Sequence, residues 1–99
     1  MIWDQRVEVH VFNQPTDMRK SHDGLAAVCR NVMGHNPLSG QVFVFMNKRR
    51  DRVKALFWDG SGLCLYYKRL EAGQFTNLWR RDSPSRLSTM ELRLILEGA

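Results

Sequence analysis

The residues of this sequence best suited to chemistry are cations gathered in one short stretch. The segment NKRRDR, residues 47–52, holds four basic side chains between two apolar runs: Lys48, Arg49, Arg50 and Arg52. Clustered cations can neutralise the phosphates of a nucleic acid and release the counterions that those phosphates hold. The same composition is common in turns that keep a protein soluble and bind nothing specific, so both interpretations stay open here.

The positive charge continues beyond this segment. Residues 48–86 contain ten Lys and Arg against four Asp and Glu, whereas the rest of the chain contains five against six. Lys54 interrupts the next apolar run, and Lys68 and Arg69 close the one after it. We expect these three side chains on the open face or the rim of a sheet, where they extend the basic surface. The same strip would also include Arg80, Arg81 and Arg86.

Groups suited to catalysis are scattered in the sequence. His10, His22 and His35 fall in different predicted elements, and no His or Cys spacing typical of a metal site occurs. The segment DGSG, residues 59–62, has the composition of a phosphate-binding loop, but a strand rather than a helix follows it. We expect a hairpin turn there. The sequence therefore predicts a protein that is not an enzyme and that binds no metal ion and no cofactor.

Composition indicates one ordinary globular domain over residues 1–99. Apolar residues make up 43% of the chain and charged residues 25%, which is typical of a folded protein. The net charge of +5 favours an acidic or polyanionic partner. Cys29 and Cys64 lie within apolar patterns, so we expect buried thiols in a reducing cytosol. No apolar run is long enough to span a bilayer, so we expect a cytoplasmic protein without a membrane partner.

Three strands form the centre of the predicted fold. Apolar runs at residues 42–46, 53–58 and 63–67 are separated by turn-forming segments, which predicts an antiparallel meander. Residues 6–12 alternate between apolar and polar side chains, which predicts a half-exposed strand. Residues 17–33 repeat apolar side chains at three- and four-residue steps. This spacing predicts an amphipathic helix that ends at Gly34.

The C-terminal part of the chain is predicted as a strand, a polar connection and a helix. The strand covers residues 75–79, and the connection covers residues 80–86. Ser88 and Glu91 form the S-x-x-E pattern of a capping box, which predicts a helix over residues 89–97. The expected fold class is α+β, with a mostly antiparallel sheet of four or five strands and two helices packed on one face.

Several motifs together resemble a known family. The chain contains DMRKS at residues 17–21, NPLSGQVFVFMNKRRDRVKALFWDGSG at residues 36–62 and LYYKRLEAGQF at residues 65–75. These motifs resemble the TnpB accessory proteins, which the second open reading frame of bacterial insertion sequences of the IS-sixty-six type encodes. The resemblance resumes at residues 86–99 and so covers most of the chain.

The resemblance implies an accessory role in transposition, beside a separate transposase and a second accessory protein. It places this role in the bacterial cytoplasm and at the DNA ends of the element. A transposase active site with three carboxylates would need a larger fold to position two metals, so we expect the partner to supply catalysis. It implies no agreed biochemical activity. The cations that the family motifs mark are Arg19, Lys20, Arg52, Lys54, Lys68 and Arg69.

We therefore expect a non-catalytic accessory factor that binds DNA through the basic hairpin and neighbouring cations. The expected DNA-binding residues are Arg19, Lys20, Lys48, Arg49, Arg50, Arg52, Lys54, Lys68 and Arg69. The alternative is an adaptor that binds the transposase or the other accessory protein without contacting DNA. In that case the basic face would meet an acidic protein surface, and the C-terminal helix or exposed aromatic side chains would provide an apolar anchor.

Overall fold

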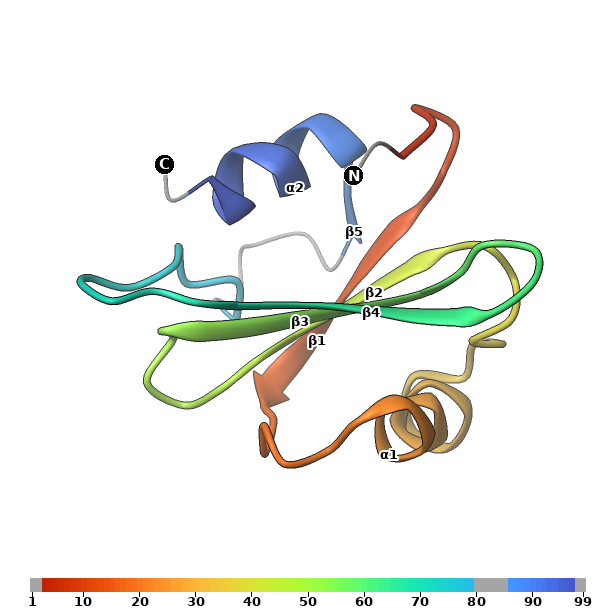
Figure 1. Ribbon diagram of the computed structural model, residues 1–99, viewed down its shortest axis with the longest axis horizontal. Coiled ribbons are helices and arrows are strands. Elements are labelled where there is room, and N and C mark those ends of the chain that lie inside the picture. The colour runs from red at the N-terminus through yellow and green to blue at the C-terminus, as the bar shows by residue number, and fades with distance from the viewer. Residues whose placement is uncertain (1–2, 80–85, 98–99) are drawn as a thin grey trace.

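The computed structural model describes residues 3–79 and 86–97. In these residues it shows one five-stranded sheet, two α-helices and a π-helical segment (Figure 1). The strands are β1 (Val9–Pro15), β2 (Val42–Met46), β3 (Arg52–Trp58), β4 (Leu63–Arg69) and β5 (Arg86–Leu87). The helices are α1 (His22–Val28), continued by the π-helical η1 (Cys29–Met33), and α2 (Thr89–Leu96).

The strands lie in the order β4-β3-β2-β1-β5. β2, β3 and β4 form the expected antiparallel meander, and β5 pairs antiparallel with β1. β1 pairs parallel with β2, because the chain returns between them through α1 and η1, a crossover long enough to restart in the same direction. The expected α+β class with a mostly antiparallel sheet is confirmed, and the sheet is mixed at this one pair.

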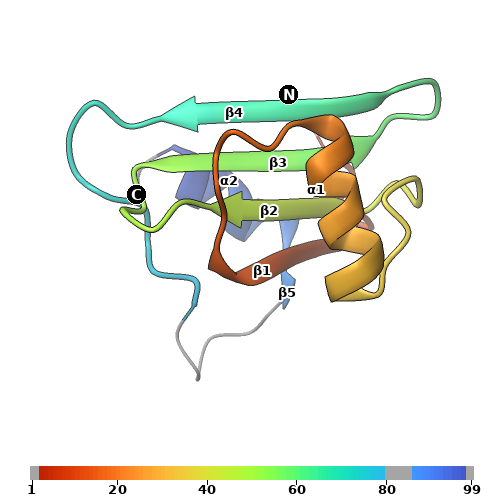
Figure 2. The same ribbon diagram turned by 90° about the horizontal axis from the view of Figure 1, so that it is seen from below.

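The two helices cover opposite faces of the sheet, so the expectation that both pack on one face was wrong. Figure 2 shows α1 in front of the strands and α2 behind them. All five residues of β2 are buried. Val42 and Val44 belong to the apolar cluster that contains Leu92 of α2, whereas Phe43 packs in a second cluster with Leu25 of α1. The unbroken apolar run of β2 is typical of a strand covered on both sides.

The first helix is shorter than predicted. The spacing predicted a helix from residue 17, but α1 begins only after Ser21, its N-cap residue. Asp17 closes a turn instead: its carboxylate accepts a hydrogen bond from the Arg19 N–H at 2.9 Å, and its carbonyl accepts one from the Lys20 N–H at 3.1 Å. The predicted stop is confirmed, because Gly34 has a φ of 73°, in the left-handed region that favours glycine.

The remaining segments agree in part with the sequence patterns. The strand predicted at residues 6–12 begins at Val9 and continues to Pro15. The strand predicted at residues 75–79 is wrong: these residues are irregular, although Phe75 and Leu78 are buried in the α2-side cluster. Of the polar connection at residues 80–86, residues 80–85 lie outside the described part, and residue 86 belongs to β5.

The capping box of α2 is confirmed. The Ser88 hydroxyl accepts a hydrogen bond from the Glu91 N–H at 3.0 Å, and the Glu91 carboxylate accepts one from the Ser88 N–H at 3.0 Å. These reciprocal bonds satisfy donors that the first turn of a helix leaves without partners. Among the described residues, no helix is long and apolar enough to cross a membrane.

Candidate nucleic-acid interface

Two segments that are distant in the sequence meet at one end of the sheet and line a hollow of about 420 Å³. One is the loop that precedes α1, and the other is the hairpin between β2 and β3. The lining residues are Thr16, Asp17, Met18, Arg19, Asn47, Lys48, Arg49 and Arg52. Four of them are cations and one is a carboxylate, which leaves a net charge of +3. We call this surface the basic hollow.

The hairpin between β2 and β3 is held by one asparagine. The Asn47 side-chain oxygen accepts hydrogen bonds from the N–H groups of Asp51 at 3.1 Å and Arg52 at 3.0 Å. Its amide nitrogen donates to the Asp51 carboxylate at 2.6 Å, and this bond lowers the pKa of Asp51. The turn is thereby fixed by its own side chains, and Lys48 and Arg49 stand exposed at its tip.

Arg50 is half-buried, unlike the exposed Lys48 and Arg49 that precede it. Its guanidinium donates to the Phe75 carbonyl at 3.2 Å and to the Gln74 side chain at 3.3 Å. The Phe75 N–H in turn donates to the Arg50 carbonyl at 2.7 Å. The φ of Arg50 is 59°, in the left-handed region that costs free energy for a side chain with a Cβ. Arg50 therefore ties the hairpin to the segment that follows β4.

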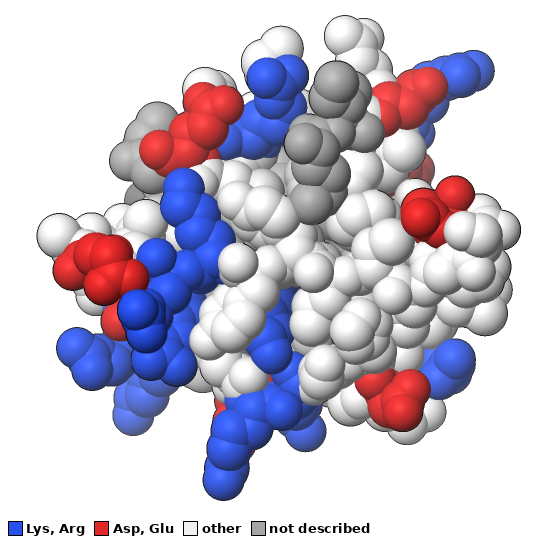
Figure 3. Space-filling model, viewed as in Figure 1, with Lys and Arg blue, Asp and Glu red and all other residues white. Residues whose placement is uncertain are grey.

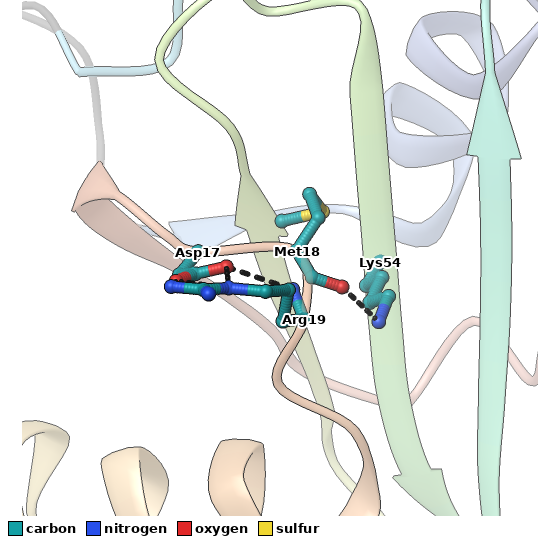
Figure 4. A network of polar contacts seen from close by, with 4 residues as sticks. All are labelled: Asp17, Met18, Arg19 and Lys54. Atoms are coloured by element: carbon teal, nitrogen blue, oxygen red, sulfur yellow. Dashed lines mark hydrogen bonds and ion pairs between the residues drawn. The ribbon is translucent and has the colours of Figure 1, made fainter.

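Lys54 is buried, so the expectation that it lies on the open face or the rim was wrong. Its ammonium donates to the carbonyls of Met18 at 2.8 Å and Lys20 at 2.6 Å, and the first of these bonds is drawn in Figure 4. The same nitrogen lies 4.7 Å from the centre of the Tyr67 ring. β3 lies between two other strands, so a side chain in its middle has neighbours on both sides. Lys54 fastens the loop of the basic hollow to the sheet.

Arg19 lies across Asp17 in the same loop, as Figure 4 shows. The two side chains form an ion pair at 2.6 Å, and the Arg19 side chain is 91% exposed. Hydrogen bonds from the side chain and the N–H of Arg19 lower the pKa of Asp17 to about 2. Asp17 is therefore ionised at neutral pH and offsets part of the local positive charge. Lys20, the next residue, is exposed beside this pair.

The remaining predicted cations lie on β3 and β4. Arg52 and Arg69 are directly opposite each other in the strand register. Arg52 donates to the Tyr67 hydroxyl at 3.5 Å, and Arg69 pairs with Glu71 at 3.0 Å. Lys68 donates to the Leu96 carbonyl at the end of α2. Arg52 thus lines the basic hollow, Arg69 lies beside it as the strand partner of Arg52, and Lys68 is turned toward the other face of the sheet.

The charge pattern is visible on the molecular surface. In Figure 3, Lys and Arg side chains gather over the left and lower part of the face, where the β2–β3 hairpin lies in Figure 1. Asp and Glu side chains are spread around the rim of the same view. The positive charge is therefore concentrated toward one end of the sheet, and not distributed evenly over this face.

The groups considered for catalysis are held in structural contacts. The Asp59 carboxylate accepts hydrogen bonds from the N–H groups of Ser61 at 2.9 Å and Gly62 at 2.8 Å, which lower its pKa to about 2. The predicted hairpin turn is thus confirmed. Cys29 is buried, and burial raises the pKa of its thiol to about 12. Cys64 is only half-buried, which corrects the expectation for that residue.

Two histidines that the sequence left in separate elements come together in the fold. The ring centres of His10, on β1, and His35, in the loop after η1, lie 4.2 Å apart. Burial, followed by the proximity of His35, lowers the pKa of His10. Phe43 lies against both rings. In the described ranges, no group of three His, Cys, Asp or Glu could hold a metal ion.

Taken together, the fold and the basic hollow define a small mixed-sheet domain with a cationic end. A family model described as "IS66 Orf2 like protein" matches residues 7–99. The chain belongs to this family, which confirms the resemblance found in the motifs. Membership supports an accessory role in the transposition of an insertion sequence.

Two relatives from Sinorhizobium fredii (strain NBRC 101917 / NGR234) match over almost the whole chain. "Uncharacterized protein y4jC" is 36% identical over 92 residues, which are 93% of this chain and 79% of the relative. "Uncharacterized protein y4hO" is 34% identical over 94 residues, which are 95% of this chain and 82% of the relative. No solved structure matches the chain.

Proposed function

We propose that this protein is a non-catalytic accessory factor of transposition that binds DNA through the basic hollow. One observation carries the proposal: the loop before α1 and the β2–β3 hairpin converge, so that four cations line one concave surface with a single carboxylate. Phosphate groups spaced along a DNA backbone fit such a surface, because each contact releases condensed counterions. Family membership provides the setting, since DNA ends are the substrate of transposition.

The predicted cations divide into two groups in this proposal. Lys48, Arg49, Arg19 and Arg52 line the hollow and contact phosphate, and Lys20 and Arg69 flank them. The other three hold the structure in place: Lys54 is buried, Arg50 bonds the segment after β4, and Lys68 bonds the end of α2. The contacts are to the backbone, so they position the protein and carry no sequence information directly.

The non-catalytic part of the proposal is supported by the state of the ionisable groups. A general acid or base works best when its pKa lies near the operating pH. Asp17 and Asp59 have pKa values lowered to about 2 and are occupied by local hydrogen bonds. The thiol pKa values of Cys29 and Cys64 are raised, which disfavours the nucleophilic thiolate. Chemistry at the DNA ends is then the task of the transposase.

The test is a titration of labelled duplex DNA carrying the terminal repeats of the element, beside an unrelated duplex of equal length. The affinity should fall steeply with salt, and the Lys48→Ala/Arg49→Ala variant should reduce the slope of log affinity against log salt by about 2. Arg30→Ala/Arg93→Ala is the matched control, because it removes equal charge from exposed residues of η1 and α2. No binding at low salt, or an equal effect of both variants, would refute the proposal.

A protein adaptor is the second candidate function, and an exposed apolar strip on α2 favours it. Met90 and Leu94 are 60% and 50% exposed, and their spacing of four residues puts them on one side of the helix. Such a strip can serve as the apolar anchor of an interface with the transposase or the other accessory protein. If it does, Met90→Ser/Leu94→Ser should abolish co-purification with the transposase, and Val32→Ser/Leu38→Ser should not.

A further inference from the structure

We propose that the outer edge of β4 is a dimer interface, through which two copies of this chain join their sheets by antiparallel pairing of β4 with β4. Among the strands of residues 3–79 and 86–97, β4 forms the long open edge of the sheet: it has seven residues and stands at the end of the strand order, whereas the other edge is the two-residue β5. An exposed strand edge presents unpaired N–H and C=O groups to a further strand.

The first five residues of β4 carry none of the charges or prolines that usually protect an edge. The strand reads LCLYYKR, and its first five residues are apolar or aromatic. Natural edges are protected by lysines, prolines or bulges. Here Lys68 is turned onto the Leu96 carbonyl of α2, and the register between β3 and β4 is continuous from Arg52 to Trp58. Tyr67, near the middle of the edge, is 47% exposed.

The hydrogen bonds at the two ends of β4 show which backbone groups point outward. Gly62 and Leu70 bond toward β3, through Asp59 and Asp51 respectively. In an antiparallel pair, every second residue of a strand exchanges backbone hydrogen bonds with its neighbour. The backbone N–H and C=O groups of the even-numbered residues of β4 therefore point toward β3. The N–H and C=O groups of Leu63, Leu65, Tyr67 and Arg69 therefore point away from the sheet and are available to a second strand.

A two-fold axis at Tyr66 matches these outward groups to each other. It pairs Leu65 with Tyr67 of the second copy and Leu63 with Arg69, and in each pair both members have outward backbone groups. The arrangement is self-complementary, as an interface between identical subunits requires. It covers the exposed ring of Tyr67 with a leucine and keeps the cationic end of one strand away from the cationic end of the other.

The charges near the edge also favour a second copy. Antiparallel pairing brings Arg69 of one copy next to Leu63 of the other, toward the turn that carries the ionised Asp59. Parallel pairing would bring Arg69 and Lys68 against themselves, and like charges opposite each other are destabilising. The axis is perpendicular to the sheet, so the two α1 faces lie on the same side. If the proposed DNA binding holds, the dimer presents two basic hollows to one DNA surface.

The first test needs no DNA, so its failure is separate from that of the proposed function. Sedimentation equilibrium over a range of concentrations should show a dimer, and amide hydrogen exchange should show protection of Leu65 and Tyr67 that increases with protein concentration. A protein that stays monomeric at the concentrations used for NMR would overturn the proposal. A dimer in which these two amides exchange freely would overturn it as well.

A matched pair of variants tests the register. Leu63→Glu places a carboxylate opposite Arg69 of the second copy, and Leu63→Lys places a like charge there, while both replace the same half-buried leucine with a long polar side chain. Because of the two-fold axis, the substituted side chain meets Arg69 at two places in the dimer. The dimer dissociation constants of the two variants should therefore differ on the order of ten-fold, and the Leu63→Glu variant should form the tighter dimer. Equal dissociation constants would contradict the proposed pairing.

Discussion

Replacing Lys54 with methionine should destabilise the fold through loss of two hydrogen bonds from a buried ammonium group. In the native protein this group donates to the carbonyls of Met18 and Lys20. Hydrogen bonds to a charged group contribute about 1.5–3 kcal/mol each, and relief of the buried charge offsets part of their loss. Methionine keeps most of the side-chain packing. We therefore expect a loss of about 3 kcal/mol in the free energy of unfolding.

Urea denaturation followed by tryptophan fluorescence measures this loss. With an m value of about 1.5 kcal/mol/M, the midpoint of the Lys54→Met variant should fall by about 2 M. Lys48→Met is the control, since its side chain is exposed at the hairpin tip and should change stability by less than about 0.5 kcal/mol. Equal stability of the Lys54→Met variant and the wild type would refute the structural role of the ammonium group.

Three further predictions concern other elements. The pKa of Asp59 is lowered in the folded state, so its stabilising effect should be complete above about pH 4 and disappear as the pH falls toward 2. The difference in urea midpoint between wild type and Asp59→Ala should close over this interval. Arg50→Gly should be more stable than Arg50→Ala by about 1 kcal/mol in chemical denaturation, because both lose the guanidinium bonds but glycine accepts the positive φ without strain. In the native protein Cys64 should react with a thiol reagent before Cys29, which is fully buried. Mass spectrometry should detect both labelling reactions in the wild type and only the slow labelling of Cys29 in the Cys64→Ser variant. Labelling of Cys29 first would contradict that order.

The elements that local chemistry determines were predicted well from the sequence. The meander of β2, β3 and β4 follows from apolar runs separated by turns, and the Asp59 turn follows from the Asp-Gly pair. The capping box at Ser88 and the helix stop at Gly34 depend on a few neighbouring residues. The turns, the capping box and the helix stop are each defined by hydrogen bonds between residues at most five positions apart, and the turns bring the apolar runs next to each other as paired strands.

The arrangement of layers was harder to predict. Helical spacing from residue 17 did not reveal that Asp17 would form a turn with Arg19, because the two conformations compete for the same backbone groups. The opposite placement of α1 and α2 depends on β2 being buried on both faces. The unbroken apolar run of β2 was the available signal, because a strand that is buried on one face only alternates between apolar and polar side chains.

The sequence predicted the positive charge of the candidate site, but it did not predict which cations face the basic hollow and which are held in structural contacts. The basic hairpin and the cations after it were visible in the sequence. The contacts of Arg50 with Phe75 and of Lys54 with Met18 join residues that are 25 and 36 positions apart, and no local pattern specifies such partners. A lysine in the middle of an apolar strand between two other strands is the one signal that could have indicated burial for Lys54.

The most direct test of the central claim is an NMR titration of isotope-labelled protein with a short duplex that carries a terminal repeat. If DNA binds the basic hollow, the largest changes in amide chemical shift should fall at residues 16–19 and 47–52, and they should diminish as salt is raised. Changes confined to α2, or no changes at low salt, would contradict the assignment of the hollow as the DNA-binding surface.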